Sequence, residues 1–307
     1  MTSYQGEDWV DVQLATISAQ TYRDWRLIIR DDGSTDRTRD IIRSWRDRFP
    51  ERIVFLDEHE PKNLGDSGNF CTLLEDSSAN YIMPSDQDDI WYADKVSKAV
   101  AYMQALEKQH GANKPLLVHF DLRMVDDNLR EIHPSYCKYQ GIRPWRKTTI
   151  GNLCLENAVH GCTIIMNRAL IQRSMPRPQS GVAGDWWYAF VAGAFGAIHA
   201  SREITIDYRR HNRNISQSSP SLLATLKGII NPLQHRRAFY AKLTEHRQMA
   251  EAVLDRFSDE LRAQDRATLC AFLGLQDLGF WARRAAIVRH RLWFTSRIRN
   301  IGLLVFA

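Results

Sequence analysis

The stretch WRLIIRDDGSTDRTRDIIRSWRDRF, residues 25–49, decides the fold, because it places a strand, a tight turn and a helix in immediate succession. Residues 25–32 form a short β-rich run that ends at the turn signal DDGSTD. Apolar side chains then recur with helical spacing through residues 39–49, and Thr35 or Asp36 could cap this helix. We therefore expect a buried strand followed by an amphipathic helix.

The same alternation continues along the chain. Further strands are expected at residues 52–57, 80–86 and 115–121, and helices at residues 65–77 and 93–109. Strands that alternate with helices favour a largely parallel sheet with helices on both faces. The sequence therefore predicts an α/β fold of Rossmann-like type with a mostly parallel sheet.

The middle of the chain predicts three more elements. Residues 161–170 form an apolar run that leads into a helix. Residues 185–196 read as a strongly apolar helix that opens with an acid, as the positive end of a helix dipole favours. Residues 197–214 read as two short strands followed by a basic loop.

After about Ser216 the chain becomes helical, rich in arginine and studded with aromatic residues. We therefore expect two regions, an α/β domain over residues 1–216 and a basic helical region over residues 217–307. The formal net charge of the 307 residues is +5, and residues 221–307 carry 14 Lys and Arg against 7 Asp and Glu. The basic character thus belongs to the C-terminal region.

Composition excludes several classes of protein. The five cysteines form no CxxC pair, which argues against a zinc site and favours a reduced, cytoplasmic compartment. No run of eighteen apolar residues predicts a membrane-spanning helix. The first residues lack the basic and apolar regions of a signal peptide.

Two acidic clusters follow predicted strands. Asp31 and Asp32 end one strand, and Asp86, Asp88 and Asp89 end another. Ligands of open α/β sheets bind beyond the carboxyl ends of the strands, so both clusters can face one crevice. A divalent cation would make their mutual repulsion tolerable, and Mg²⁺ is often bound by few carboxylates together with phosphates. The pattern therefore favours a metal–diphosphate site.

Five motifs in order give the chain a family resemblance. It resembles glycosyltransferase family 2 with the GT-A fold, in the bacterial rhamnosyltransferase-like branch, over about residues 2–216. The motifs are SYQGEDWVDVQLATISAQTYRDWRLIIRDDGSTDRT at residues 3–38, SDQDDIW at 85–91, GCTIIMNRAL at 161–170, GDWWYAFVAGAFG at 184–196 and YRRHNRN at 208–214.

On the donor side, the resemblance implies that Ser3, Tyr4 and Asp32 line a nucleoside pocket. Asp86 and Asp88 would form the family's DxD pair, with Asp88 as the direct ligand of Mg²⁺ or Mn²⁺. The donor would be a nucleotide sugar, with dTDP-L-rhamnose or a UDP-sugar as the expectation.

On the acceptor side, the resemblance implies that Asp185 is the catalytic base. His211, a further metal ligand, and Arg209 would close over the metal and the diphosphate. Asp185 would take a proton from an acceptor hydroxyl that attacks the anomeric carbon from the opposite face, which inverts the configuration. The acceptor would be a saccharide or a lipid-linked saccharide in cell-surface polysaccharide assembly, at the inner face of the cell membrane.

The sequence departs from the family pattern at three places. Met1 stands almost at the turn that should follow the first strand, so that strand is expected to be missing. Gly184 replaces a frequent His before the base, which weakens arguments about how Asp185 is positioned. Gln5 replaces the usual Asn of the first turn.

Simpler readings stay open beside these roles. The acidic turn could be a solvated cap of the next helix, Asp185 could be only a helix cap, and Arg209 and His211 could be solvated loop residues. Two other functions are also open. A sugar nucleotidyltransferase would need a glycine-rich basic signature near the start, which is absent. A truncated, non-catalytic nucleotide-binding relative would explain the missing strand.

The last 27 residues hold six arginines and no acid. Trp281, Ala285, Val288 and Leu292 are expected on one helical face. Arginine with aromatic residues suits an interfacial helix on anionic lipid, so peripheral membrane contact is one expectation. The alternative is a helix packed on the catalytic domain with a basic outer face. No nucleic-acid partner is expected, because no recognised binding motif accompanies the charge.

Overall fold

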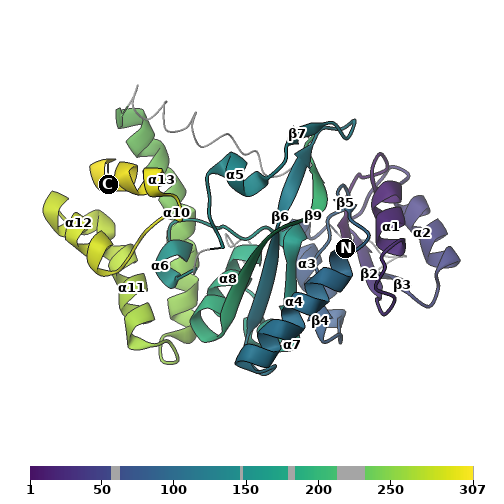
Figure 1. Ribbon diagram of the computed structural model, residues 1–307, viewed down its shortest axis with the longest axis horizontal. Helices are drawn as coiled ribbons and strands as arrows, with labels where there is room; N and C mark the ends of the chain where they lie inside the picture. Colours follow the sequence, from purple (N-terminus) through teal and green to yellow (C-terminus); the bar gives the residue numbers. More distant parts are fainter. Residues whose placement is uncertain (57–62, 146–147, 179–183, 213–231, 307) are drawn as a thin grey trace.

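The computed structural model describes residues 1–56, 63–145, 148–178, 184–212 and 232–306. A parallel sheet of order β1-β2-β3 lies at one end of the molecule and carries α1 and α2 (Figure 1). Its strands are β1 (Thr2–Ser3), β2 (Leu27–Asp31) and β3 (Ile53–Leu56), and its helices are α1 (Val10–Ser18) and α2 (Thr38–Arg48).

A larger mixed sheet of order β4-β8-β6-β9-β5, with β7 paired to β6, forms the centre of the molecule. In it β6 and β9 run parallel, whereas β8 is antiparallel to both β4 and β6, and β5 is antiparallel to β9. Its strands are β4 (Tyr81–Ile82), β5 (Ile90–Trp91), β6 (Leu116–Val125), β7 (Glu131–His133), β8 (Ile164–Asn167) and β9 (Ala197–Arg209).

Helices cover both faces of the larger sheet, and the alternation of side chains along β6 divides the core in two. Leu116 and Val118 pack with the α4 side, whereas Leu117 packs with the α8 side. The helices of the α/β region are α3 (Gly65–Asp76), α4 (Lys95–His110), α5 (Tyr136–Gln140), α6 (Ile150–Leu153), α7 (Arg168–Ser174) and α8 (Gly184–Phe195), with a 3₁₀ turn at Gly161–Thr163.

The C-terminal helices share the core on the α8 side. Met249, Val253 and Phe257 of α10 and Phe272 of α11 are buried in one cluster with the side chains of α8. These helices are α10 (Pro232–Phe257), α11 (Ala263–Leu273), α12 (Phe280–Arg289) and α13 (Arg297–Phe306), with a 3₁₀ turn at Gly274–Asp277 (Figure 1). The predicted boundary at Ser216 lies outside the described residues.

The predicted α/β fold with a C-terminal helical region is confirmed, and the structure refines four details. The larger sheet is mixed rather than mostly parallel. Residues 197–209 form one strand instead of two, because β9 absorbs its irregularities as register shifts against β6 near Asp121. In place of a full first strand, β1 has two residues, which pair with Arg30 and Asp31. The fourth detail concerns α12.

The predicted apolar face of the tail is wrong at one position. Helix α12 ends at Arg289, so Leu292 lies beyond the helix and is fully buried. Trp281, Ala285 and Val288 do share the exposed face of α12. None of the helices in the described part of the chain combines the length and the apolar composition that a bilayer crossing requires.

Candidate active site

The loop after β1 is joined directly to the acidic turn. The Tyr4 N–H donates to Gln87 Oε1 at 2.9 Å, and Gln87 Nε2 donates back to the Tyr4 carbonyl at 2.8 Å. A Cβ at Gly6 would lie 2.2 Å from Gln87 Oε1, so only glycine leaves room for this side chain. The two predicted donor-side motifs therefore lie at one edge of the fold.

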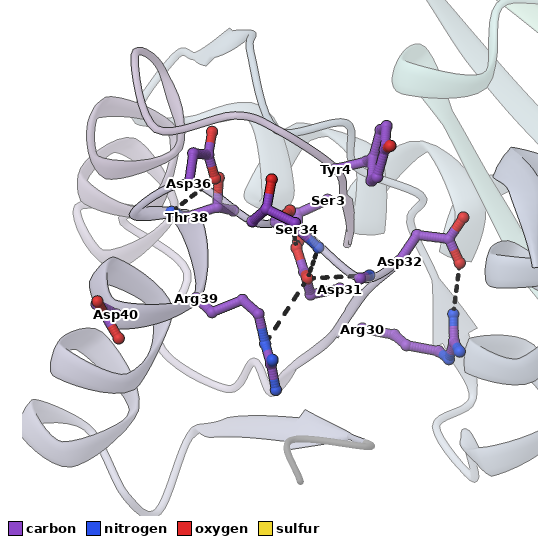
Figure 2. Close-up of polar contacts among 12 residues, drawn as sticks. Ser3, Tyr4, Arg30, Asp31, Asp32, Ser34, Asp36, Thr38, Arg39 and Asp40 are labelled. Atoms are coloured by element: carbon purple, nitrogen blue, oxygen red, sulfur yellow. Dashed lines mark hydrogen bonds and ion pairs between the residues drawn. The ribbon is translucent and has the colours of Figure 1, made fainter. Parts of the chain in front are cut away.

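Asp31 shapes the turn of the first motif. Its carboxylate accepts hydrogen bonds from the Ser3 hydroxyl at 2.8 Å, from the Ser34 hydroxyl at 2.6 Å and from the Ser34 N–H at 2.7 Å. Figure 2 shows these groups around the carboxylate, with the Arg39 guanidinium 3.9 Å from it. Ser3, a predicted nucleoside contact, therefore donates its hydroxyl hydrogen to Asp31.

Asp32 is buried and holds the start of α3. Oδ1 accepts from Arg30 Nη1 at 3.0 Å (Figure 2). It also accepts from the Leu64 N–H at 2.7 Å, and Oδ2 accepts from the Gly65 N–H at 2.9 Å. Tyr4, by contrast, is 50% exposed. In this structure Asp32 has a clear structural role, and its contact with a nucleoside stays a prediction.

The structure brings Asp88, Arg209 and His211 together. Asp88 Oδ2 lies 2.8 Å from His211 Nε2, and the imidazole stacks on Trp9 with ring centroids 4.0 Å apart. Arg209 donates from Nε to the Asp88 carbonyl and from Nη1 to the Asp127 carbonyl. His211 and Arg209 are therefore not solvated loop residues.

This pair fits a divalent cation. Adjacent ligand atoms around Mg²⁺, with bonds of about 2.1 Å in an octahedral shell, lie roughly 3 Å apart, which is close to the 2.8 Å between Asp88 Oδ2 and His211 Nε2. A second cluster places Asp86, Asp89 and Cys162 ligand atoms within 4.8 Å of one another. We favour the first site, because Asp89 and Cys162 are buried and a thiol is a poor ligand for a hard cation.

Two buried ionisable side chains at the acidic turn, Asp89 and Lys95, have shifted pKa values. Burial, with the nearby charges of Asp88 and Asp86, raises the pKa of Asp89 well above its ordinary value. Burial lowers the pKa of Lys95 to about 8, although Lys95 still donates to the Cys162 carbonyl at 2.6 Å. Burial therefore makes the negative charge of Asp89 costly beside the carboxyl groups of Asp86 and Asp88.

Asp185 lies at the start of α8 and is held by three N–H groups. Oδ1 accepts from Asn157 Nδ2 at 3.0 Å and from the Trp186 N–H at 2.7 Å, and Oδ2 accepts from the Gly161 N–H at 3.1 Å. Burial raises the pKa of Asp185 to about 6 despite these hydrogen bonds and the nearby Arg177 charge. A carboxylate with a pKa near the working pH suits a general base.

Two consecutive residues connect the base to the acidic turn. The Gly161 N–H binds Asp185, while the Cys162 thiol lies in the cluster with Asp86 and Asp89. The predicted base and the predicted DxD element therefore belong to neighbouring parts of one site, although Asp86 itself lies with Asp89 and Cys162 rather than with the Asp88–His211 pair.

The departure at Gly184 has a structural explanation. A Cβ at this position would lie 2.5 Å from Arg177 Nη1, so the buried Arg177 takes up the space of a side chain here. Arg177 was missed from the sequence, as were Trp9, Gln87 and Asn157. Trp9 and Gln87 lie inside recognised motifs, whereas Arg177 and Asn157 are placed by contacts between distant segments.

Comparisons of the sequence with known proteins find a family profile and several relatives. The sequence profile of Glycosyl transferase family 2 matches residues 1–159. The dTDP-rhamnosyl transferase RfbG of Shigella flexneri is 29% identical over 251 residues, which cover 77% of this chain and 81% of that protein. The glucosyltransferase WfgD of Escherichia coli is 32% identical over 172 residues, 56% of this chain and 60% of that protein.

Solved structures show the same fold at low identity. TarS 1–349 of S. aureus has a TM-score of 0.57 at 12% identity, covering 99% of this chain and 81% of that chain. The mannosyltransferase PcManGT of Pyrobaculum calidifontis, in complex with GDP-Man and Mn²⁺, has a TM-score of 0.51 at 14% identity, covering 98% and 85%. The family profile spans more than half of the chain, the fold is GT-A, and the chain belongs to glycosyl transferase family 2 as a glycosyltransferase.

Proposed function

We propose that this glycosyltransferase is inverting and metal-dependent, and that it moves a sugar from a nucleotide-sugar donor to a saccharide or lipid-linked acceptor in cell-surface polysaccharide assembly. The observation that carries the proposal is the contact between Asp88 Oδ2 and His211 Nε2, beside a site whose base has a pKa of about 6.

Asp88 and His211 would hold Mg²⁺ or Mn²⁺, with Asp86 close by in the same turn. A cation held there would supply positive charge that stabilises a diphosphate leaving group. Arg209 fixes the geometry of the pair, because it ties the Asp88 carbonyl to the Asp127 carbonyl. Its positive charge also lies beside the path of the diphosphate.

Asp185 would act on the acceptor. Its carboxylate takes the proton of an acceptor hydroxyl while that oxygen attacks the anomeric carbon on the face opposite the leaving group. Asn157 and the Gly161 N–H fix the orientation of the carboxylate. A single displacement of this kind inverts the anomeric configuration.

The donor is proposed to be dTDP-L-rhamnose, with a UDP-sugar as the alternative. RfbG, which is similar over 77% of this chain, is named a dTDP-rhamnosyl transferase, whereas the name of WfgD specifies UDP-Glc. Ser3, Tyr4 and Asp32 are the proposed nucleoside contacts. The half-exposed Tyr4 ring offers a stacking surface for the base.

Incubation of the protein with dTDP-rhamnose, UDP-glucose, UDP-N-acetylglucosamine and GDP-mannose tests this function. We expect release of a nucleoside diphosphate with Mn²⁺ or Mg²⁺ and none with EDTA. A nucleotidyltransferase would instead release pyrophosphate from a nucleoside triphosphate and a sugar 1-phosphate. No turnover with any donor would favour the non-catalytic alternative and reject the proposal.

A lipid-linked acceptor would place the enzyme at the inner face of the membrane, and the last two helices offer a contact surface. Trp281 is 80% exposed, and Val288, Ile298, Ile301 and Val305 are more than half exposed. Three arginines of this region are also exposed, namely Arg289, Arg291 and Arg297. Exposed apolar side chains with basic neighbours suit a membrane that contains anionic lipid.

Vesicle flotation tests this contact. We expect binding to phosphatidylglycerol-containing vesicles that falls with added salt and with Trp281→Ser. The matched control is Val12→Ser, which removes an exposed apolar side chain from α1 at the other end of the molecule. Equal flotation of the two variants would reject the membrane contact. It would favour the alternative, in which these helices pack on the catalytic domain with a basic outer face.

A further inference from the structure

A cavity of about 240 Å³ lies between the α/β region and the C-terminal helices. One wall comes from residues 136–142, residues 155–160 and Trp186, and the other comes from Leu243 and His246 of α10, Phe294, and Arg299 of α13. Nothing in the metal site or the donor motifs contributes to it. The C-terminal region therefore forms part of a cavity rather than only covering the core.

The cavity begins one hydrogen bond from the base. Asn157 lines it and donates from Nδ2 to Asp185 Oδ1 at 3.0 Å. Trp186, another lining residue, directly follows Asp185 and donates from its indole N–H to the Leu153 carbonyl. A molecule in this cavity would therefore lie beside the group that takes the acceptor proton.

Aromatic rings and neutral polar groups line the cavity. Tyr136 meets His160 edge to face with ring centroids 4.3 Å apart, and Trp186 meets His246 in the same way at 4.5 Å. Gln140 Nε2 is buried and has no hydrogen-bond acceptor among the described residues. Aromatic faces with a few fixed polar groups match a sugar ring, which has apolar C–H faces and hydroxyl edges.

The Glu156 carboxylate and the Arg299 guanidinium, which both line the cavity, are paired with each other. Glu156 is the only acid of the cavity, and its carboxylate is taken by Arg299 Nη1 at 2.6 Å and by the Thr295 N–H. Burial lowers the pKa of His160 to about 4, so this imidazole is neutral at physiological pH. An anionic sugar would bring a second negative charge beside Glu156 without a cation of its own, which is costly in a buried site.

We propose that this cavity binds the terminal ring of a neutral acceptor sugar, and that His246 and Phe294 of the C-terminal region help to select it. The inference rests on the proposed transferase function and adds the class of acceptor. A volume of about 240 Å³ is below the roughly 300–1,000 Å³ of drug-sized pockets, so it suits one ring rather than a longer saccharide.

Acceptor kinetics and direct binding test the inference together. The probes are the octyl glycosides of L-rhamnose, glucose and N-acetylglucosamine, with octyl glucuronide as the anionic comparison. We expect at least one neutral glycoside to be used, and the glucuronide to be used at least tenfold less well. His246→Ala should raise the KM for the neutral acceptor by about tenfold, which is the effect expected from the loss of one contact. The KM for the donor should stay unchanged.

The matched control is Gln248→Ala, which alters an exposed residue two positions along the same helix. Saturation-transfer NMR of the same glycosides gives a readout that needs no turnover. The inference is overturned if the glucuronide equals the neutral glycosides, if no neutral glycoside binds, or if His246→Ala behaves like Gln248→Ala. If a neutral glycoside binds but no donor is turned over, the transferase proposal is rejected and the inference that the cavity binds a neutral sugar is not.

Discussion

The raised pKa of Asp185 makes a quantitative prediction about the pH dependence of transfer. With a pKa of about 6, the carboxylate fraction is about 90% at pH 7 and about 10% at pH 5. If Asp185 is the base, the transfer rate should fall about ninefold over this interval. A carboxyl group at its ordinary pKa would give an almost constant rate above pH 5.

Acid unfolding driven by the titration of Asp185 cannot produce the same loss of transfer rate. The pKa of Asp185 is raised in the folded state, so its contribution to stability is fully present below the unfolded pKa and is lost as the pH rises through about 6. Acid therefore favours the fold at this residue while it removes the base. A rate that falls while the circular dichroism signal stays constant would separate the two effects.

One substitution should move the profile in a known direction. Asn157→Ala removes a hydrogen bond that favours the charged form of Asp185, so the acid limb should shift to higher pH. Asn128→Ala, an exposed asparagine elsewhere in the chain, serves as the control. Initial rates from pH 5 to 8 at saturating donor would measure the shift. A flat profile from pH 5 to 7, or an unmoved limb in Asn157→Ala, would refute the assignment of the base.

Two further substitutions test how the C-terminal region is attached. Arg299→Ala leaves the Glu156 carboxylate, 5% exposed, without its cation and should lower the free energy of unfolding by about 3 kcal/mol in urea titrations; an unchanged midpoint would contradict this. Gly151→Ala builds a Cβ 2.4 Å from the Arg291 carbonyl oxygen, so we expect a loss of roughly 1–3 kcal/mol in thermal unfolding. Wild-type stability of this variant would mean that the two backbones are not in close contact.

Local signals in the sequence were enough to predict the strand in residues 25–32. The apolar run before DDGSTD predicted a strand at residues 25–32, and the structure has β2 at Leu27–Asp31. Turn chemistry and helical periodicity act over a few residues, so they can be read without a tertiary model of the chain. The pairing of β6 with β9 could not be read in this way, because more than seventy residues separate the two strands.

The same distinction between local signals and long-range contacts applies to the residues of the site. The resemblance to family motifs identified Asp88, His211 and Asp185, and the structure brings the first two into contact. The place of Arg177 beside Gly184 and the cavity wall at His246 depend on contacts between distant segments. Such contacts leave no periodic pattern or motif, which is why the sequence alone did not indicate them.

Manganese binding tests the central claim most directly. Titration of Mn²⁺ in the presence of UDP or dTDP, followed by electron paramagnetic resonance, measures the ion held by the protein and nucleotide together. We expect saturable binding to the wild type and at least a tenfold loss in Asp88→Asn, whose amide cannot supply the carboxylate ligand. Equal Mn²⁺ affinity in the two proteins would contradict the account, because the ion would then not lie between Asp88 and His211.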